Sequence, residues 1–312
     1  MIALLDPKLR DRVALVTGTN NPHGIGAAVA QAFAVQGAKV FLHYFRWTPQ
    51  SRVDSNSNKS SSPGESFYYS QQTKSIDEVL ERVRKSGAQV AALEADVADP
   101  AVIKTLFDQA EATLGPVEVL VNNAAYWEAD TFLPTDADLA NKLVELWTDR
   151  PQSLNTPAVD RMFAVNTRAP ALMIAEFARR HITRGARFGR IINVSTAGAE
   201  RFPSEVTYGA SKFALESYTR SAAAELGKFG VTVNAVSLGP VQTGWITSEL
   251  ERAILPARID TPGGGGRCRR FSRLSPGPLA DRAADLCWQG ARDETTKKVP
   301  IRRELWELSA WS

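Results

Sequence analysis

The chain has few of the residues that build metal centres and disulfide frameworks. Its 312 residues include only two cysteines and three histidines. Both cysteines, Cys268 and Cys287, lie near the carboxyl terminus and do not form a CxxC pair. The histidines are scattered along the chain and form no ligand cluster. We therefore predict no disulfide scaffold and no metal site.

Long apolar runs and a strong net charge are also missing. No run approaches the ~18–20 apolar residues needed to span a bilayer, and residues 1–12 lack the basic-then-apolar order of a signal peptide. The net charge is +3 at pH 7, and residues 1–256 contain 26 basic and 27 acidic residues. We therefore predict a cytoplasmic protein that binds neither membranes nor nucleic acid.

Short apolar runs alternate with helical patterns along most of the chain. Strands are predicted at residues 12–17, 38–44, 89–94, 117–122, 190–194 and 232–237. Helices are predicted at residues 25–36, 76–86, 100–114, 158–180 and 208–229. Such alternation is typical of an α/β fold in which a doubly wound parallel sheet is covered by helices on both faces.

Two segments interrupt this alternation. Residues 51–75 are rich in serine and contain Pro63-Gly64, which predicts an exposed insertion. Residues 128–157 carry several large apolar side chains. They are predicted to form either a lid or subunit contact over the substrate, or a surface helix that packs its own apolar side.

A glycine-rich turn follows the first predicted strand and precedes a helix. It reads Thr17-Gly18-Thr19-Asn20-Asn21-Pro22-His23-Gly24-Ile25-Gly26. Glycines allow a pyrophosphate to approach the backbone closely, while the N–H groups and the dipole of the helix face it. The turn therefore indicates a dinucleotide site, because its strand–turn–helix context is the one that such a site requires.

The strongest catalytic signal is Tyr208-Gly209-Ala210-Ser211-Lys212 at the start of a predicted helix. Positions four apart share one helical face, so the Tyr208 phenol and the Lys212 ammonium can point into one cleft. A nearby cation favours the phenolate and lowers the pKa of a tyrosine. Tyr208 is therefore predicted to be a general acid and base for carbonyl–alcohol interconversion.

Further elements occur in a fixed order around this motif. They are Asn122-Asn123-Ala124-Ala125 after the fourth strand, Asn166, the hydroxyls of Ser195-Thr196 at a strand end, and Ser237-Leu238-Gly239-Pro240-Val241-Gln242-Thr243. With the glycine turn and the Tyr-x-x-x-Lys motif, they resemble the short-chain dehydrogenase/reductase family over about residues 10–256. The similarity is greatest to the branch that includes 3-oxoacyl-[acyl-carrier-protein] reductases.

The resemblance implies a Rossmann-like fold, a nicotinamide cofactor, a small-molecule carbonyl or alcohol substrate and assembly as a homodimer or homotetramer. Tyr208 would donate the proton, Lys212 would hold the nicotinamide ribose, Asn166 would anchor a proton-relay water, and Ser195 or Thr196 would fix the carbonyl. The implied cofactor-binding residues are Gly18, Asn20, His23, Gly24, Ile25, Gly26, Arg46, Asp96, Val97, Asn123, Ala124, Ala125, Tyr208, Lys212, Gly239, Val241 and Thr243.

The chain departs from the family pattern at three places before its tail. The glycine turn is longer than usual, so residues 20–23 are predicted to bulge outward; some enoyl reductases have a similarly lengthened turn. Counting from Asn193 points to Thr196 as the catalytic hydroxyl, whereas counting back from Tyr208 points to Ser195. The second strand ends in His43-Tyr44-Phe45-Arg46 without an acid, and basic groups suit a 2′-phosphate. NADP(H) is therefore predicted over NAD(H).

The tail does not follow the family pattern. After Pro262 come four glycines and an arginine-rich stretch, where a helix and a seventh strand are expected. Read one nucleotide out of phase, permitted codons spell those elements, and one extra G after the Pro262 codon turns Pro-Glu-Glu-Val into Pro-Gly-Gly-Gly. We hypothesise a frameshift from a gene lesion or a sequencing error; the alternative is a genuine, divergent tail. Residues 1–256 would then be the oxidoreductase domain, and residues 257–312 a poorly ordered tail.

Three interpretations follow. The leading one is a carbonyl or alcohol oxidoreductase, and an enoyl reductase is the alternative within enzymes. The third is a non-catalytic dinucleotide-binding remnant, because loss of the last strand would expose a sheet edge and disturb subunit assembly.

Overall fold

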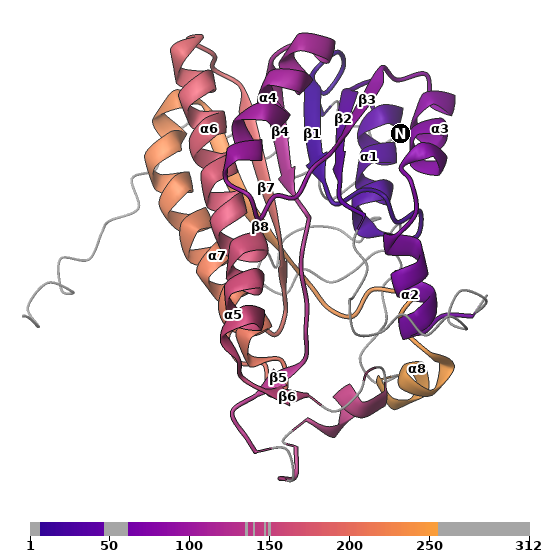
Figure 1. Cartoon of the computed structure of the whole chain (residues 1–312). Helices are drawn as coiled ribbons and strands as arrows, with labels where there is room; N and C mark the ends of the chain where they lie inside the picture. The colour runs from indigo at the N-terminus through magenta and orange to yellow at the C-terminus, as the bar shows by residue number, and fades with distance from the viewer. Residues whose placement is uncertain are drawn as a thin grey trace, which may run out of the picture.

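The computed structural model describes residues 7–46, 62–134, 137–139, 141–146, 148 and 151–254. A parallel six-stranded sheet in the order β3-β2-β1-β4-β7-β8 forms its centre (Figure 1). Its strands are β1 Val13–Thr17, β2 Lys39–Tyr44, β3 Val90–Glu94, β4 Val117–Asn122, β7 Gly189–Thr196 and β8 Val231–Leu238. The strand order reverses between β1 and β4, which is the position where doubly wound sheets bind ligands.

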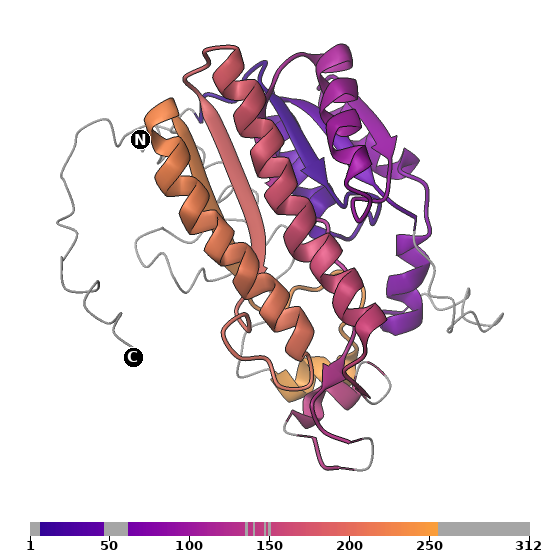
Figure 2. The same cartoon turned by 60° about the vertical axis from the view of Figure 1, so that its left-hand side comes forward.

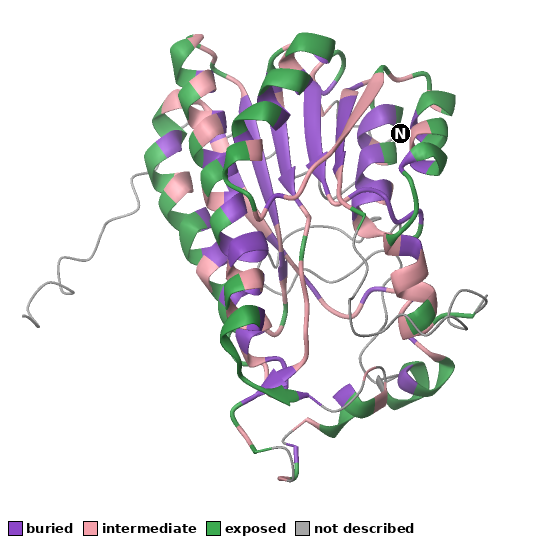
Figure 3. Ribbon diagram, in the orientation of Figure 1, coloured by how far each residue is buried: buried purple, intermediate pink, exposed green. Residues whose placement is uncertain are grey.

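Helices cover both faces of this sheet (Figures 1 and 2). They are α1 Ile25–Val35, α2 Glu65–Gln72, α3 Asp77–Lys85, α4 Ala101–Leu114, α5 Thr156–Phe163, α6 Ala169–Thr183, α7 Val206–Leu226 and α8 Ser248–Ile254. Helices α1 and α3 share one apolar core with the sheet, and α4, α6 and the end of α7 share the other. The central strands are therefore buried on both faces (Figure 3), as their nearly continuous apolar sequences predict.

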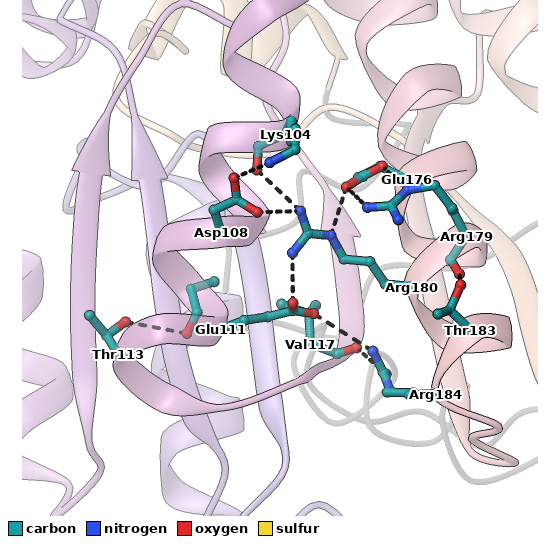
Figure 4. A network of polar contacts seen from close by, with 11 residues as sticks. Lys104, Asp108, Glu111, Thr113, Val117, Glu176, Arg179, Arg180, Thr183 and Arg184 are labelled. Carbon is teal, nitrogen blue, oxygen red and sulfur yellow. Dashed lines mark hydrogen bonds and ion pairs between the residues drawn. The ribbon is translucent and has the colours of Figure 1, made fainter.

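An arginine-centred cluster joins α4 to α6 on the second face (Figure 4). The Arg180 guanidinium contacts Asp108 and Glu111 of α4 at 2.6 Å each and Glu176 of α6 at 2.7 Å. Charge-assisted hydrogen bonds from one guanidinium to three carboxylates fix the two helices in register. This cluster lies on the outer layer and supports the scaffold.

The insertion predicted at residues 51–75 is only partly exposed where the structure describes it: residues 62–63 and 73–75 are exposed, whereas residues 65–72 between them form a helix. Glu65–Gln72 forms α2, which is half-buried; residues 51–61 lie outside the described part of the chain. The Gly64 amide donates to the Gly244 carbonyl at 2.9 Å, and the Phe67 ring packs against Gly244. Helix α2 therefore packs on the segment that follows β8.

The segment at residues 128–157 is only partly regular. Strands β5 Asp130–Thr131 and β6 Gln152–Ser153 pair in parallel, and a short 3₁₀ helix spans Lys142–Leu146. Leu139 and Val144 are buried, so the segment does pack its own apolar side chains, and Val144 belongs to a 3₁₀ helix that contacts α8.

The helix predicted at residues 158–180 is interrupted. A π-helical turn at Ala164–Arg168 separates α5 from α6. Such turns occur frequently at functional sites, and this one carries Asn166.

At the other end of the sheet, β8 is the edge strand among the described residues. The predicted loss of a seventh strand and the hypothesised frameshift in the tail at residues 257–312 both concern residues outside the described part of the chain. Within the described residues, no helix is long and apolar enough to cross a membrane.

Candidate active site

The predicted site residues come from different parts of the chain and meet at one edge of the sheet. The glycine turn follows β1, Arg46 follows β2, Asp96 follows β3 and Asn123 follows β4, while Ser195 and Thr196 end β7. Because the strands are parallel, their carboxyl ends lie at the same edge. We refer to residues 18–26 as the phosphate end of the site, and to Asn166, Tyr208 and Lys212 as its catalytic end.

The glycine turn folds inward rather than outward. Asn20 and Asn21 are buried, and only His23 of the predicted bulge is exposed. The Asn20 side-chain amide donates to the Gln72 carbonyl at 2.7 Å, and that of Asn21 donates to the Thr243 carbonyl at 3.1 Å. The outward bulge is thus wrong for residues 20–22, because neighbouring backbone carbonyls satisfy the buried amides.

Two glycines of the turn are required by close approach. Gly18 has φ +71°, and a side chain there would lie 2.8 Å from Cα of Ala124. A Cβ on Gly26 would lie 2.2 Å from the Gly18 carbonyl oxygen and 2.6 Å from the side-chain Nδ2 of Asn123. The amino end of α1 therefore lies directly against the turn, which only glycine permits.

Asparagines brace the strand ends. The Asn123 side chain donates to the Thr17 and Gly18 carbonyls at 2.8 and 2.9 Å, which ties β4 to the glycine turn. The Asn122 amide donates to Asn193 of β7 at 2.8 Å, and Asn193 donates to Thr219 of α7 at the same distance. These hydrogen bonds hold the carboxyl ends of β1, β4 and β7 at a fixed spacing.

His43 is not the basic group that the sequence suggested. Its Nε2 lies 2.8 Å from the Ala95 carbonyl, and the Gly18 amide donates to its Nδ1 at 3.4 Å. Burial lowers the pKa of His43 to about 4. The ring is therefore neutral at pH 7, and it links the glycine turn to β3 instead of carrying charge.

Arg46 and Asp96 are each paired with another charged residue. Arg46, which is exposed, forms two hydrogen bonds to Glu94 at the end of β3, at 2.7 and 2.8 Å. Asp96 accepts from Arg161 at 2.8 Å and from the Ala98 amide at 2.9 Å. Val97 is buried and belongs to the second apolar core.

At the catalytic end, Asn166 is fully buried and held on two sides. Its Nδ2 donates to the Tyr126 carbonyl at 2.8 Å and to Oγ of Ser211 at 3.0 Å, and its Oδ1 accepts from the Tyr126 amide. The Ser211 Oγ in turn donates to the Tyr208 carbonyl at 2.8 Å. Asn166 thus connects the segment after β4 to the first turns of α7.

Tyr208 and Lys212 lie on the same face of α7, as predicted. The Lys212 Nζ is 5.7 Å from the centre of the Tyr208 ring and donates to the Val194 carbonyl at 2.9 Å. Burial lowers the pKa of Lys212 to about 8. Burial, followed by the charges of Glu205 and Tyr68, raises the pKa of Tyr208. This differs from the expected lowering, because burial disfavours the phenolate more than the ammonium favours it.

The two candidate hydroxyls at the end of β7 have different surroundings. Ser195 is buried, and its Oγ donates at 3.0 Å to Glu216, a buried residue of α7. Thr196 is half-buried, and its Oγ1 accepts a long hydrogen bond, 3.4 Å, from the Gly198 amide. Successive strand residues point to opposite faces, so the two hydroxyls face different surroundings.

The segment after β8 completes the site edge. Val241 is buried in the first core, and the Thr243 carbonyl accepts from Asn21 of the glycine turn. A side chain at Gly239 would have no neighbour within 4 Å. The Trp245 indole donates to the Val241 carbonyl of its own segment, and the Phe202 ring centre is 6.2 Å from that of Tyr208.

Sequence reasoning missed two contributors to this site. Helix α2 brings Tyr68 near enough to raise the pKa of Tyr208, although its Ser-rich surroundings suggested an exposed loop. Glu205, three residues before Tyr208, is buried and accepts from the indole of Trp127. The helical spacing to Tyr208 was the available signal for Glu205. In the described part of the chain, no cluster of His, Cys, Asp or Glu could hold a metal ion.

Comparison with known proteins agrees with this geometry. A family model described as short chain dehydrogenase matches residues 60–253. The chain is 28% identical to the uncharacterised oxidoreductase YjdA of Bacillus subtilis, covering 84% of this chain and 89% of that protein. It is 33% identical to the NADPH-dependent aldehyde reductase 2 of Arabidopsis thaliana, a chloroplastic protein, covering 79% of this chain and 78% of the other.

Solved structures show the same fold. A Sinorhizobium meliloti chain assigned as a short-chain alcohol dehydrogenase superposes with a TM-score of 0.66 at 22% identity, covering 92% of this chain and 93% of that one. The narrower resemblance to 3-oxoacyl-[acyl-carrier-protein] reductases stays a prediction. With the family model matched over more than half of its length, this chain belongs to the short-chain dehydrogenase/reductase family and is an oxidoreductase.

Proposed function

We propose that this oxidoreductase transfers a hydride between NADP(H) and a carbonyl or secondary alcohol substrate, with Tyr208 as general acid and base. The observation that carries the proposal is the placement of Tyr208 and Lys212 on one face of α7, against the carboxyl end of β7. Asn166 supports this arrangement: its side-chain amide donates to the Ser211 hydroxyl, which in turn donates to the Tyr208 carbonyl.

The phosphate end fits a dinucleotide. Gly24 is the amino-terminal cap residue of α1, and no side chain of the described residues caps this helix end, so the first N–H groups of α1 remain available to an anion. Gly18 and Gly26 keep the surface free of side chains where a pyrophosphate must approach. When bound, the nicotinamide supplies or accepts the hydride; the chain's residues bind it and handle the proton.

The proton step falls to Tyr208. In reduction, the phenol donates its proton to the carbonyl oxygen as the alkoxide develops, and in oxidation the phenolate removes the proton of the alcohol. The raised pKa of Tyr208 keeps the phenol protonated at neutral pH, which suits the reducing direction. Lys212 would hold the ribose and favour the phenolate, and water anchored near Asn166 would return the proton.

Thr196 is the better candidate for fixing the carbonyl. The Ser195 hydroxyl already donates to the buried Glu216 carboxylate, whereas the Thr196 hydroxyl has only a long contact to a backbone amide. A hydroxyl donates a single proton, so Ser195 would have to give up its hydrogen bond to Glu216 in order to donate to a substrate.

A preference for NADP(H) now depends on fewer groups. His43 is neutral and buried, so Arg46 is the remaining cation at the end of β2. Arg46 is exposed and can turn from Glu94 toward a 2′-phosphate. One relative, the Arabidopsis aldehyde reductase, is named as NADPH-dependent.

The catalytic unit would be residues 1–256, followed by the frameshifted tail. Resequencing the codons for Pro262 to Gly266 tests the frameshift directly: without an extra G, the gene encodes a complete reductase. If the G is present, size-exclusion chromatography together with NADPH turnover distinguishes an active enzyme from a poorly assembling remnant.

The bracing of both ends of the site favours the enzyme, and Asn166, Tyr208 and Lys212 together favour carbonyl chemistry over enoyl reduction.

The acid–base role is tested with Tyr208→Phe. Turnover of simple ketones with NADPH should fall by about 10²–10⁴-fold, while NADPH binding, followed by fluorescence titration, stays nearly intact. Tyr218→Phe is the matched control, because Tyr218 is a half-exposed phenol on the same helix. Persistent turnover in Tyr208→Phe would refute the assignment.

A further inference from the structure

Glu205 is a buried carboxyl group beside the proposed proton donor. It occupies the amino-terminal cap position of α7, three residues before Tyr208, and is only 4% exposed. Its backbone carbonyl accepts from the Gly209 amide at 3.0 Å, so the residue is fixed to the same first turn that carries Tyr208. A negative charge on Glu205 raises the pKa of Tyr208, which places the two groups within electrostatic reach.

The two carboxyl oxygens of Glu205 differ in their hydrogen bonding. Oε2 accepts from the indole Nε1 of Trp127, at 2.5 Å. Oε1 is buried and has no hydrogen-bond partner among the described residues. A buried carboxylate oxygen without a donor is costly, so this environment favours the protonated acid.

A second buried carboxyl group lies near Glu205. Asp130 of β5 is 1% exposed, and its Oδ1 accepts from the Thr207 amide at 3.0 Å. Burial raises the pKa of Glu205 to about 7; the Trp127 hydrogen bond lowers it and the Asp130 charge raises it further. The groups that act on Glu205 are thus Trp127 from the segment after β4 and Asp130 from β5, with Tyr208 on its own helix.

We propose that Glu205 is a positioning residue whose protonation state controls the proton of Tyr208, a role that rests on the proposed function. The acid form leaves the surroundings of Tyr208 uncharged, and the carboxylate form puts a negative charge beside it. Loss of the Glu205 proton therefore disfavours the phenolate, which suppresses alcohol oxidation and sustains carbonyl reduction at higher pH.

Removing the Glu205 charge shifts the pH profiles of oxidation and reduction in the same direction. Oxidation needs the phenolate, so removing the Glu205 charge moves the rising limb of its pH profile to lower pH. Reduction needs the phenol, so the same change moves the falling limb of its profile to lower pH. In Glu205→Gln both limbs of kcat/KM should move down by roughly one pH unit.

The first experiment requires no turnover. Infrared spectra of the full chain are recorded as a function of pH, and wild type is compared with Glu205→Gln. A protonated-carboxyl band that is lost in the variant and titrates near neutral pH is expected. Trp127→Phe removes the donor to Oε2, so this band should titrate at higher pH in that variant.

The second experiment follows kcat/KM with NADPH and a simple ketone, and with NADP⁺ and the corresponding alcohol. Glu200→Gln, an exposed glutamate of the preceding loop, is the matched control and should leave both profiles unchanged. The proposal is overturned if no such band titrates, or if the Glu205→Gln profiles coincide with those of wild type. A titrating band in a wild-type protein without turnover would instead contradict the proposed function.

Discussion

At the phosphate end of the site the polar contacts join neutral groups, whereas at the catalytic end ionisable side chains are buried. Asn20, Asn21 and Asn123 satisfy backbone carbonyls, and His43 is present as the neutral ring. Around Tyr208, by contrast, Lys212 and Glu205 both have pKa values displaced by burial toward neutral pH. At the phosphate end the structure depends on close packing of uncharged groups. At the catalytic end burial sets the pKa values of the ionisable side chains.

The proposed function accounts for this difference between the two ends. A pyrophosphate brings its own charge, so the chain needs only backbone N–H groups and space. Proton transfer instead requires side chains that can gain or lose a proton near the working pH. The two ends should therefore respond differently to substitution: the phosphate end to added volume, and the catalytic end to removed polar groups.

The largest of these effects is expected for substitutions at the end of β7. Thr196→Val should lower kcat/KM by about 10²-fold with little loss of stability, since it removes a donor to the developing charge. Ser195→Ala should instead leave kcat/KM of the folded enzyme near wild type. Its free energy of unfolding should fall by about 1 kcal/mol or more, because Glu216 loses a buried partner. Ketone reduction kinetics and urea denaturation would separate the two, and the reverse pattern would assign the role to Ser195.

A smaller effect is expected from added volume at the phosphate end. Gly26→Ala places a methyl group against the Gly18 carbonyl, and should lower the free energy of unfolding by about 1–3 kcal/mol and weaken NADPH binding. Gly227→Ala is the control, since nothing lies within 4 Å of its Cβ position and its φ of −54° suits alanine. Equal melting temperatures for the two variants would show that the turn relaxes freely.

The smallest effect is expected at Arg46. It is the exposed cation that we propose contacts the cofactor, so its contribution should be weaker than that of the buried groups. Arg46→Ala should raise the Kd for NADPH several-fold while that for NADH changes little. Loss of the Glu94 pair itself should cost about 1 kcal/mol or less, since it is exposed to solvent. Isothermal titration with both nucleotides measures the change, and equal weakening of both would contradict a 2′-phosphate contact.

Much of the fold followed from short-range pattern. The alternation of apolar runs and helical periods predicted each strand of the main sheet close to its observed bounds, because buried parallel strands must be nearly continuously apolar. The break at Ala164–Arg168 was not predicted, and residues 158–180 were expected to form one continuous helix. Helix α2 was missed for a related reason: its polar composition gives no sign that Phe67 and Tyr68 are held against Gly244 and the site.

The sequence by itself determined the α/β class, the positions of Gly18 and Gly26, and the pairing of Tyr208 with Lys212 on one helical face. These depend on local rules, namely strand and helix periodicity and the conformational freedom of glycine. Only the tertiary structure decided that His43 is neutral, that Ser195 is committed to Glu216, and that Glu205 is buried beside Tyr208. Burial and hydrogen-bond partners arise from residues distant in the chain, and they set the charge state of each group.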